Sequence, residues 1–146
     1  MEPFRVVEEG ANLRPTQASL LVTYLISAGS AVTTLEGAGA LPVGQLPPGA
    51  VTRFKSRMRF EAAPGRYKVG QMLQTYEPGA WSVSEAPKAN RLKTVVSGEV
   101  TVLTGATQQA YMAGQSWVEG TGQAWLSGNL GSGRAVVAVS TTMPVD

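Results

Sequence analysis

The side chains that could carry chemistry in this sequence are carboxylates, tyrosines and permanent cations, because it contains neither histidine nor cysteine. Histidine is the commonest general base and metal ligand near neutral pH, and cysteine supplies thiolate nucleophiles. Histidine-centred mechanisms, disulfides and thiolate metal sites are therefore excluded. The remaining candidates for acid–base chemistry are Tyr67, Tyr76, Tyr111 and Glu119. Each of them also fits an ordinary residue of a β-strand.

The charges are few but unevenly distributed along the chain. Charged residues make up 15% of the 146 residues, and the formal net charge is +2. Most basic residues lie in the middle third: Arg53, Lys55, Arg57, Arg59, Arg66, Lys68, Lys88, Arg91 and Lys93. This asymmetry indicates an anionic partner without naming one. Nucleic acid is not expected, because the basic stretch lacks interleaved aromatic side chains and the total positive charge is modest.

The apolar run 19–26 is too short to span a bilayer. Three glutamates precede it where a signal peptide would carry positive charge. We interpret it as a buried strand, with no membrane association and a cytoplasmic location.

Many short strands separated by Gly, Pro or Asn predict an all-β fold, a sandwich or closed barrel. The expected strands are 19–26, 31–35, 41–46, 51–60, 66–76, 80–85, 91–97, 99–103, 110–112, 115–119, 123–127 and 134–141. Hairpin turns are expected at Pro64-Gly65 and across Gly105 to Gln109, and a sharp turn is expected at Ser97-Gly98. No linker divides the chain, so we expect an arm over 1–18 and one domain over 19–146.

Residues 51–60 alternate basic and apolar side chains, which predicts a half-buried strand with a solvated basic face. A sharper alternative is an edge strand whose like charges prevent association of sheets, or a patch for an acidic partner.

The second half of the chain resembles the cupin superfamily. The first cupin motif opens on Pro-Gly and closes on Gly, as Pro78-Gly79 and Gly98 do here. The second motif begins at Gly114 and keeps Gly122 and Asn129 at matching offsets. The resemblance implies a jelly-roll β-barrel in which these glycines form turns with positive φ. It also implies a homodimer, because cupins often pair by exchanging amino-terminal strands.

The positions that hold a metal in cupins carry other residues here. The two histidines of the first motif fall on Glu85 and Pro87, and its glutamate falls on Arg91. The histidine of the second motif falls on Trp125. A lone carboxylate beside a guanidinium and an indole does not make a transition-metal site, and arginine cannot lose its proton. The resemblance therefore implies the fold without the metal, and we expect no cofactor.

Strand alternation places Trp81, Val83 and Glu85 on one face, and Arg91, Lys93 and Val95 on one face of the next strand. If both faces point inward, Glu85 and Arg91 form an ion pair where the metal would lie, and Trp125 stacks on the guanidinium. Two interpretations stand side by side: a plugged site, and a pocket for a small anionic organic ligand such as a carboxylate or sugar acid. The expected ligand-binding residues are Trp81, Glu85, Arg91, Lys93 and Trp125.

Three functions follow from these readings. The first is a non-enzymatic, metal-free binding domain for a small anionic organic ligand. The second is a metal-independent isomerase or lyase that uses Glu85, tyrosines and Arg91 or Lys93. The third is a degenerate cupin with a structural or assembly role. An open cavity near Glu85, Arg91 and Trp125 would reject the third, and a proton-active pair inside it would favour the second over the first.

Overall fold

The computed structural model describes Thr16 and residues 65–145, and in this part of the chain all regular structure is β-strand. The strands are β1 (Arg66–Tyr76), β2 (Arg91–Ser97), β3 (Glu99–Thr104), β4 (Thr107–Met112), β5 (Ser116–Glu119), β6 (Leu126–Gly128) and β7 (Ala135–Val145). The predicted all-β fold is confirmed for these residues.

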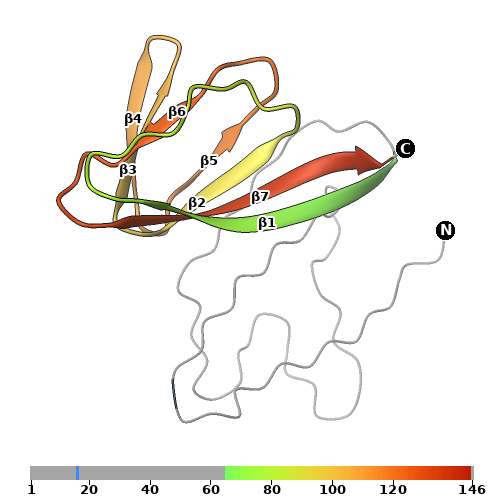
Figure 1. The fold of residues 1–146 in the computed structure, drawn as a ribbon. Coiled ribbons are helices and arrows are strands. Elements are labelled where there is room, and N and C mark those ends of the chain that lie inside the picture. The colour runs from blue at the N-terminus through green and yellow to red at the C-terminus, as the bar shows by residue number, and fades with distance from the viewer. Residues whose placement is uncertain (1–15, 17–64, 146) are drawn as a thin grey trace. The chain divides into compact units, whose positions relative to one another are not determined.

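The strands form two antiparallel sheets. The four-stranded sheet has the order β1-β7-β2-β5, and the three-stranded sheet has the order β4-β3-β6. β1 and β7 are the longest strands and run side by side over their whole length, from Arg66 opposite Val145 to Tyr76 opposite Ala135 (Figure 1). β2 lies between β7 and β5, so its side chains meet partners on both sides.

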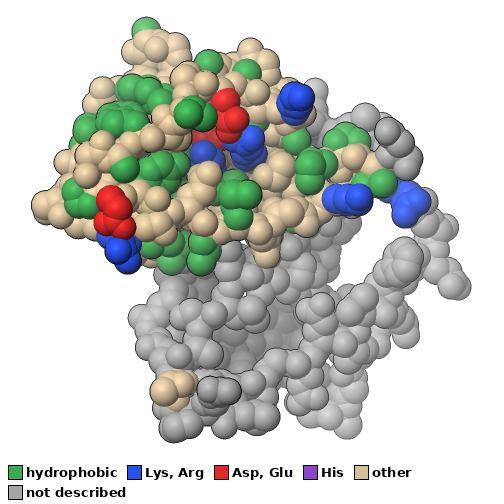
Figure 2. Space-filling view, in the orientation of Figure 1, with side chains coloured by type: hydrophobic (Ala, Val, Ile, Leu, Met, Phe, Trp, Pro, Cys, Tyr) green, Lys and Arg blue, Asp and Glu red, His purple; other side chains and the backbone are tan. Residues whose placement is uncertain are grey.

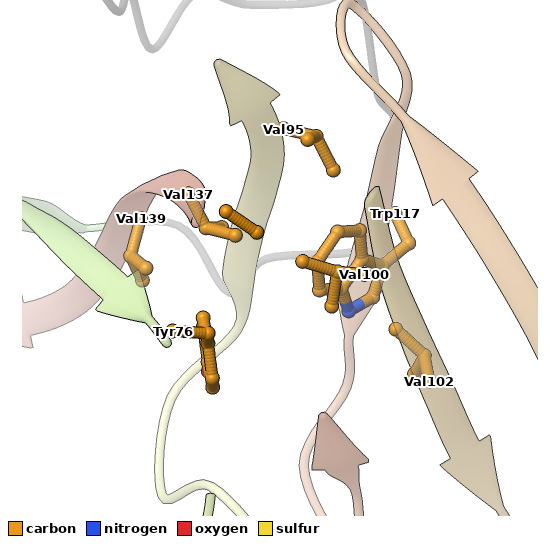
Figure 3. Packing of buried hydrophobic residues seen from close by; sticks show 8 residues of the cluster. Tyr76, Val95, Val100, Val102, Trp117, Val137 and Val139 are labelled. Carbon is orange, nitrogen blue, oxygen red and sulfur yellow. The ribbon is translucent and has the colours of Figure 1, made fainter. Parts of the chain in front are cut away.

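The core lies between the two sheets. Alternate residues of a strand point to the same face, so Val95 and its cross-strand partner Val137 share the inner face of the four-stranded sheet. Val100 and Val102 enter from β3, and Trp117 from β5. Figure 3 shows side chains from both sheets directed toward one another. The indole of Trp117 also packs on Tyr111, with ring centroids 4.8 Å apart.

The glycines of the two motifs form turns, as the resemblance implied. Gly79, Gly98, Gly114 and Gly122 all have positive φ, between 77° and 88°. Gly98 is the most constrained of them, because an added Cβ would lie 2.8 Å from the Cα of Ala135. The chain can thus leave the four-stranded sheet after β2 and enter the three-stranded sheet at β3 only with glycine there.

The expected strands 66–76 and 91–97 are observed with the same bounds, and the other described strands differ by a few residues at their ends. One strand is not observed as predicted: residues 80–85 make only two isolated bridges, Trp81 with Gly128 and Glu85 with Trp125. The hairpin loop after β3 is also shorter than expected, because β4 already begins at Thr107. Several predictions concern residues outside the described part of the chain. These are the arm 1–18 apart from Thr16, the strands 19–26, 31–35 and 41–46, the basic stretch 51–60, and the turn at Pro64.

The described residues include no helix that is long and apolar enough to cross a membrane.

Candidate functional site

The register between β2 and β5 assembles a group of charges on the inner face of the four-stranded sheet. Arg91 lies opposite Glu119, and Lys93 lies opposite Trp117. Because Arg91 and Lys93 are two residues apart, they point to the same face as the core residue Val95. The sequence predicted this shared face, and the structure confirms it. Along the inner face of β2, the apolar side chain of Val95 is therefore followed by two cationic side chains, Lys93 and Arg91.

Four charged side chains alternate in sign across this face. Arg91 donates through Nη1 to Glu85 Oε1, and the same nitrogen lies 3.8 Å from Glu119 Oε2. Lys93 Nζ lies 2.9 Å from Glu119 Oε1. The order is thus Glu85, Arg91, Glu119, Lys93, running from an exposed carboxylate to a buried pair. On the face shown in Figure 2, acidic side chains likewise lie against basic ones.

The inner pair is almost completely removed from water. The exposed fraction of the side chain is 5% for Lys93 and 2% for Glu119. Trp117 donates its indole N–H to Glu119 Oε1 over 3.2 Å. The Lys93 ammonium also stands 5.9 Å from the centroid of the Trp117 ring. A buried ion pair persists only when further polar contacts stabilise it, and Trp117 and Arg91 provide them here.

The outer pair was predicted from the sequence and is present. Arg91 bonds Glu85, whose side chain is 49% exposed. This hydrogen bond holds the pKa of Glu85 below its usual range. The predicted stacking of Trp125 on the guanidinium is not observed. In the described part of the chain, the cation over an indole is Lys93, and the indole is Trp117.

The segment from Trp81 to Glu85 is tied to β6 and supplies one wall of the site. Glu85 and Trp125 exchange backbone hydrogen bonds of 3.2 and 3.0 Å. The indole N–H of Trp125 donates to the carbonyl of Gly120 over 3.3 Å. Trp81 lies elsewhere: its ring packs on Gly128 and is 40% exposed. Trp81 pairs with Gly128 and Glu85 pairs with Trp125, so the register shifts by one residue between these two bridges. Trp81 therefore does not point into the pocket as Glu85 does.

A pocket of about 340 Å³ opens between this wall and the inner face of the sheet. Its polar lining comes from β1, from residues 82–85 and from the charged face: Gln74, Thr75, Tyr76, Ser82, Glu85, Lys93 and Glu119. Val83 and Trp125 supply the apolar lining. Of the expected ligand-binding residues, Glu85, Lys93 and Trp125 line this pocket. Arg91 lies on the other side of Glu85, and Trp81 lies outside.

The tyrosines that the sequence singled out have different surroundings. Tyr76 lines the pocket and donates to Gln74 Oε1 over 3.2 Å. Burial, with a smaller effect from the Glu119 carboxylate, raises the pKa of Tyr76. Burial also raises the pKa of Tyr111, which packs in the core against Trp117. Tyr67 lies near the start of β1, outside the pocket lining. A raised pKa keeps Tyr76 a neutral hydrogen-bond donor and acceptor.

Asn129 ties Tyr76, which lines the pocket, to the loop before β7, a role that its place in the second motif did not reveal. Its side chain is fully buried, and its amide nitrogen donates to the carbonyls of Tyr76 and Gly133 over 3.0 and 2.7 Å. Its side-chain oxygen accepts from the N–H of Gly131 over 2.9 Å. Asn129 thus joins the end of β1 to the loop before β7. Only a structure shows which backbone groups such an amide satisfies.

The described residues do not fit the metal that the cupin resemblance would supply. They include no group of three or more His, Cys, Asp or Glu side chains that could hold an ion. Glu85 and Glu119 are instead bonded to Arg91 and Lys93. A cation would have to displace these partners and lie beside two fixed positive charges.

Comparison with known proteins gives similarity at the level of structure. Protein-family models give no match to the sequence, and curated proteins give none either. The chain is similar to an oxalate oxidase (23% identity, 50% of this chain, 41% of that chain, TM-score 0.46). It is also similar to the Cupin_2 domain of an XRE family transcriptional regulator from Enterobacter cloacae (17% identity, 53% of this chain, 84% of that chain, TM-score 0.49). A third similar structure is a sugar phosphate isomerase of the cupin superfamily from Silicibacter pomeroyi (19% identity, 51% of this chain, 50% of that chain, TM-score 0.47).

Two of these three solved structures are described as cupins. The match spans less than half of the oxalate oxidase chain.

Proposed function

We propose that this domain binds a small polar organic ligand, without a metal, in the pocket bounded by Lys93, Glu119 and Trp125. The observation that carries the proposal is the buried Lys93–Glu119 pair in the wall of a pocket of about 340 Å³. That volume is in the range of small-molecule sites, which combine apolar walls with a few fixed polar groups.

The energetics of the buried pair support a binding role. Taking two charges out of water costs several kcal/mol per ion, and apolar residues of similar size often stabilise a core at least as well. A sequence under no functional demand would lose nothing by filling this face with valine and leucine, as it does at Val95 and Val137. The charged side chains of Lys93 and Glu119 instead offer hydrogen bonds to a bound ligand.

The groups in this pocket suit hydroxyl and amine groups of a ligand. Gln74, Glu85 and Glu119 offer acceptor oxygens, and Tyr76 and Ser82 offer hydroxyls. Trp125 gives an apolar surface against which a carbon skeleton can pack. The anionic ligand expected from the sequence fits less well directly on Lys93, because Glu119 already occupies its ammonium. An anion there would compete with a carboxylate that has almost no access to water.

Filling the pocket tests the proposal. Val83 lines the pocket with 77% of its surface exposed, so Val83→Trp should block the pocket without disturbing the core. Leu130→Trp is the matched control, because Leu130 is 59% exposed and does not line the pocket. The native protein and both variants are screened against neutral polyols, amino acids and sugar acids by saturation-transfer NMR.

We expect at least one compound class to bind saturably to the native protein and to Leu130→Trp, and at least tenfold more weakly to Val83→Trp. Equal binding to all three proteins would place the ligand elsewhere, and no binding by any class would remove the proposed function.

A metal-independent enzyme is the second candidate. Lys93 and Glu119 lie within hydrogen-bond reach of each other at the pocket wall, and an ammonium beside a carboxylate is a residue pair used in acid–base chemistry. Because each is already bonded to the other, the binding role remains the first candidate. An assembly role based on a filled barrel is disfavoured by the open pocket beside Glu85 and Trp125.

A further inference from the structure

A second pocket of about 270 Å³ adjoins the first and shares Glu85 with it. It is formed by the loop between residues 86 and 89, by Arg91 of β2, and by Thr141 and Met143 of β7. Register places Thr141 directly opposite Arg91, so both side chains are on the inner face of the sheet. The Glu85–Arg91 pair thus stands between two pockets.

The two pockets have opposite formal charge. Among the described residues, the first pocket is lined by two carboxylates, Glu85 and Glu119, and by one ammonium, Lys93. The second is lined by two cations, Lys88 and Arg91, and by Glu85 alone. A single molecule that extends over Glu85 would therefore meet an excess of negative charge at one end and of positive charge at the other.

Several donors in the second pocket have no partner within the described part of the chain. The contacts of Arg91 with Glu85 and Glu119 both run through Nη1, which leaves Nη2 and Nε to donate. Lys88 makes no ion pair with a described residue, and the Thr141 hydroxyl makes no hydrogen bond with one. A guanidinium edge, an ammonium and a hydroxyl that converge on one pocket are the usual recognition groups for an oxyanion.

We propose that this second pocket is an oxyanion subsite, in which Arg91, Lys88 and Thr141 hold a carboxylate or phosphate group. The inference rests on the proposed function, because it assigns the oxyanion to the same ligand whose hydroxyl or amine groups occupy the first pocket. Glu85 then has a positioning role, since it turns the guanidinium and marks the border between the two subsites. The anionic character that the charge distribution indicated belongs to this pocket and not to Lys93.

Inorganic phosphate is the first probe, at constant ionic strength, and acetate is the second, which separates a phosphate from a carboxylate preference. Binding is followed by the backbone amide NMR signals of the full chain. Phosphate should cause saturable shifts at Ala86, Ala89 and Thr141. Lys88→Met should weaken binding by about tenfold, the loss expected for one charge-assisted hydrogen bond. Thr141→Val, which keeps the side-chain shape, should weaken it by a smaller factor.

Arg134→Gln is the matched control. It also removes one positive charge, but Arg134 is an exposed residue paired with Glu77 and lies in neither lining. We expect phosphate binding to this variant to equal that of the native protein. The subsite is refuted if both anions fail to give saturable shifts in these residues, or if Arg134→Gln weakens binding as much as Lys88→Met.

Val83→Trp separates the two proposals. It blocks the first pocket and should leave phosphate binding in the second pocket unchanged. Phosphate binding together with no organic ligand would refute the proposed function alone. An organic ligand in the first pocket without any anion effect on residues 86–89 would refute the subsite alone.

Discussion

Glu119 is a carboxylate with almost no access to water, and two donors and a second cation surround it. Lys93 lies 2.9 Å away, the Trp117 indole donates over 3.2 Å, and Arg91 stands at 3.8 Å. At the scale of single residues, this is where the domain differs most from an ordinary β-sheet core. The stability of such a pair depends on both partners being present, because the removal of one leaves an uncompensated buried charge.

Lys93→Met should therefore destabilise the protein by about 3–5 kcal/mol, measured as the free energy of unfolding in urea. The double variant Lys93→Met with Glu119→Gln should recover most of that loss, because no charge is left buried and the glutamine oxygen can still accept from Trp117. Equal stability of the single variant and the native protein would mean that Glu119 is solvated or that another cation replaces Lys93.

The same double variant distinguishes binding from catalysis. A pure binding pocket should keep affinity for compounds that do not contact the pair, whereas acid–base turnover should be lost together with both titratable groups.

At the scale of elements, the segment 79–85 is held to β6 by a short ladder of backbone hydrogen bonds. Asn129 N donates to Ala80 O over 2.9 Å, and Ser82 N donates to Ser127 O over 2.7 Å. The Trp81 ring lies flat against Gly128 and leaves no room for a side chain there. An added Cβ would come within 2.2–2.6 Å of three atoms of that ring. This segment carries Val83 and Glu85 into the pocket wall.

Gly128→Ala should consequently destabilise the fold by about 1–3 kcal/mol, the usual cost of forcing extra volume into a packed site. Gly70→Ala is the matched control, because Gly70 also lies within a strand and a Cβ there meets nothing within 4 Å. It should be neutral or slightly stabilising. Thermal unfolding followed by circular dichroism measures both.

Trp81→Ala in the Gly128→Ala background completes the test. If the indole is the obstacle, the two substitutions together should cost less than the sum of their separate effects. Additive effects would show that the strain at Gly128 comes from the backbone and not from Trp81.

At the scale of the whole molecule, the charged side chains on the described inner face are paired with one another. The charges on the inner face alternate, and both carboxylates have a cationic partner in contact. A divalent cation would gain two oxygen ligands and lose two favourable ion pairs, which is a poor exchange for any metal that also prefers nitrogen ligands.

Protein purified without added metal and dialysed should accordingly contain far less than one equivalent of any transition metal by plasma mass spectrometry. Added Zn²⁺ or Mn²⁺ should not raise the unfolding temperature, since an ion that binds the native state specifically would do so. One equivalent that survives dialysis would overturn the metal-free proposal. The homodimer, the cytoplasmic location and the absence of a nucleic-acid partner stay predictions.

Strand positions could be predicted because the pattern of side chains that forms a strand is local. The bounds of β1 and β2 follow from runs of alternating and branched residues between Gly, Pro and Asn, and the motif glycines mark turns that need positive φ. The Glu85–Arg91 ion pair could also be predicted from the sequence, because its two residues are only six positions apart in the chain. The segment 80–85 could not, because its pairing with β6 changes register between two isolated bridges.

The sequence alone therefore determined the all-β class of the described residues, the turns at the motif glycines, the exclusion of histidine and cysteine chemistry, and the outer ion pair. Only the tertiary structure decided that Lys93 belongs to Glu119, that Trp81 lies outside the pocket, and that Asn129 joins distant loops. These facts depend on the register between strands far apart in the chain, and a shift of one residue would turn every side chain to the other face. Alternation shows which residues share a face, but not which residues meet across it.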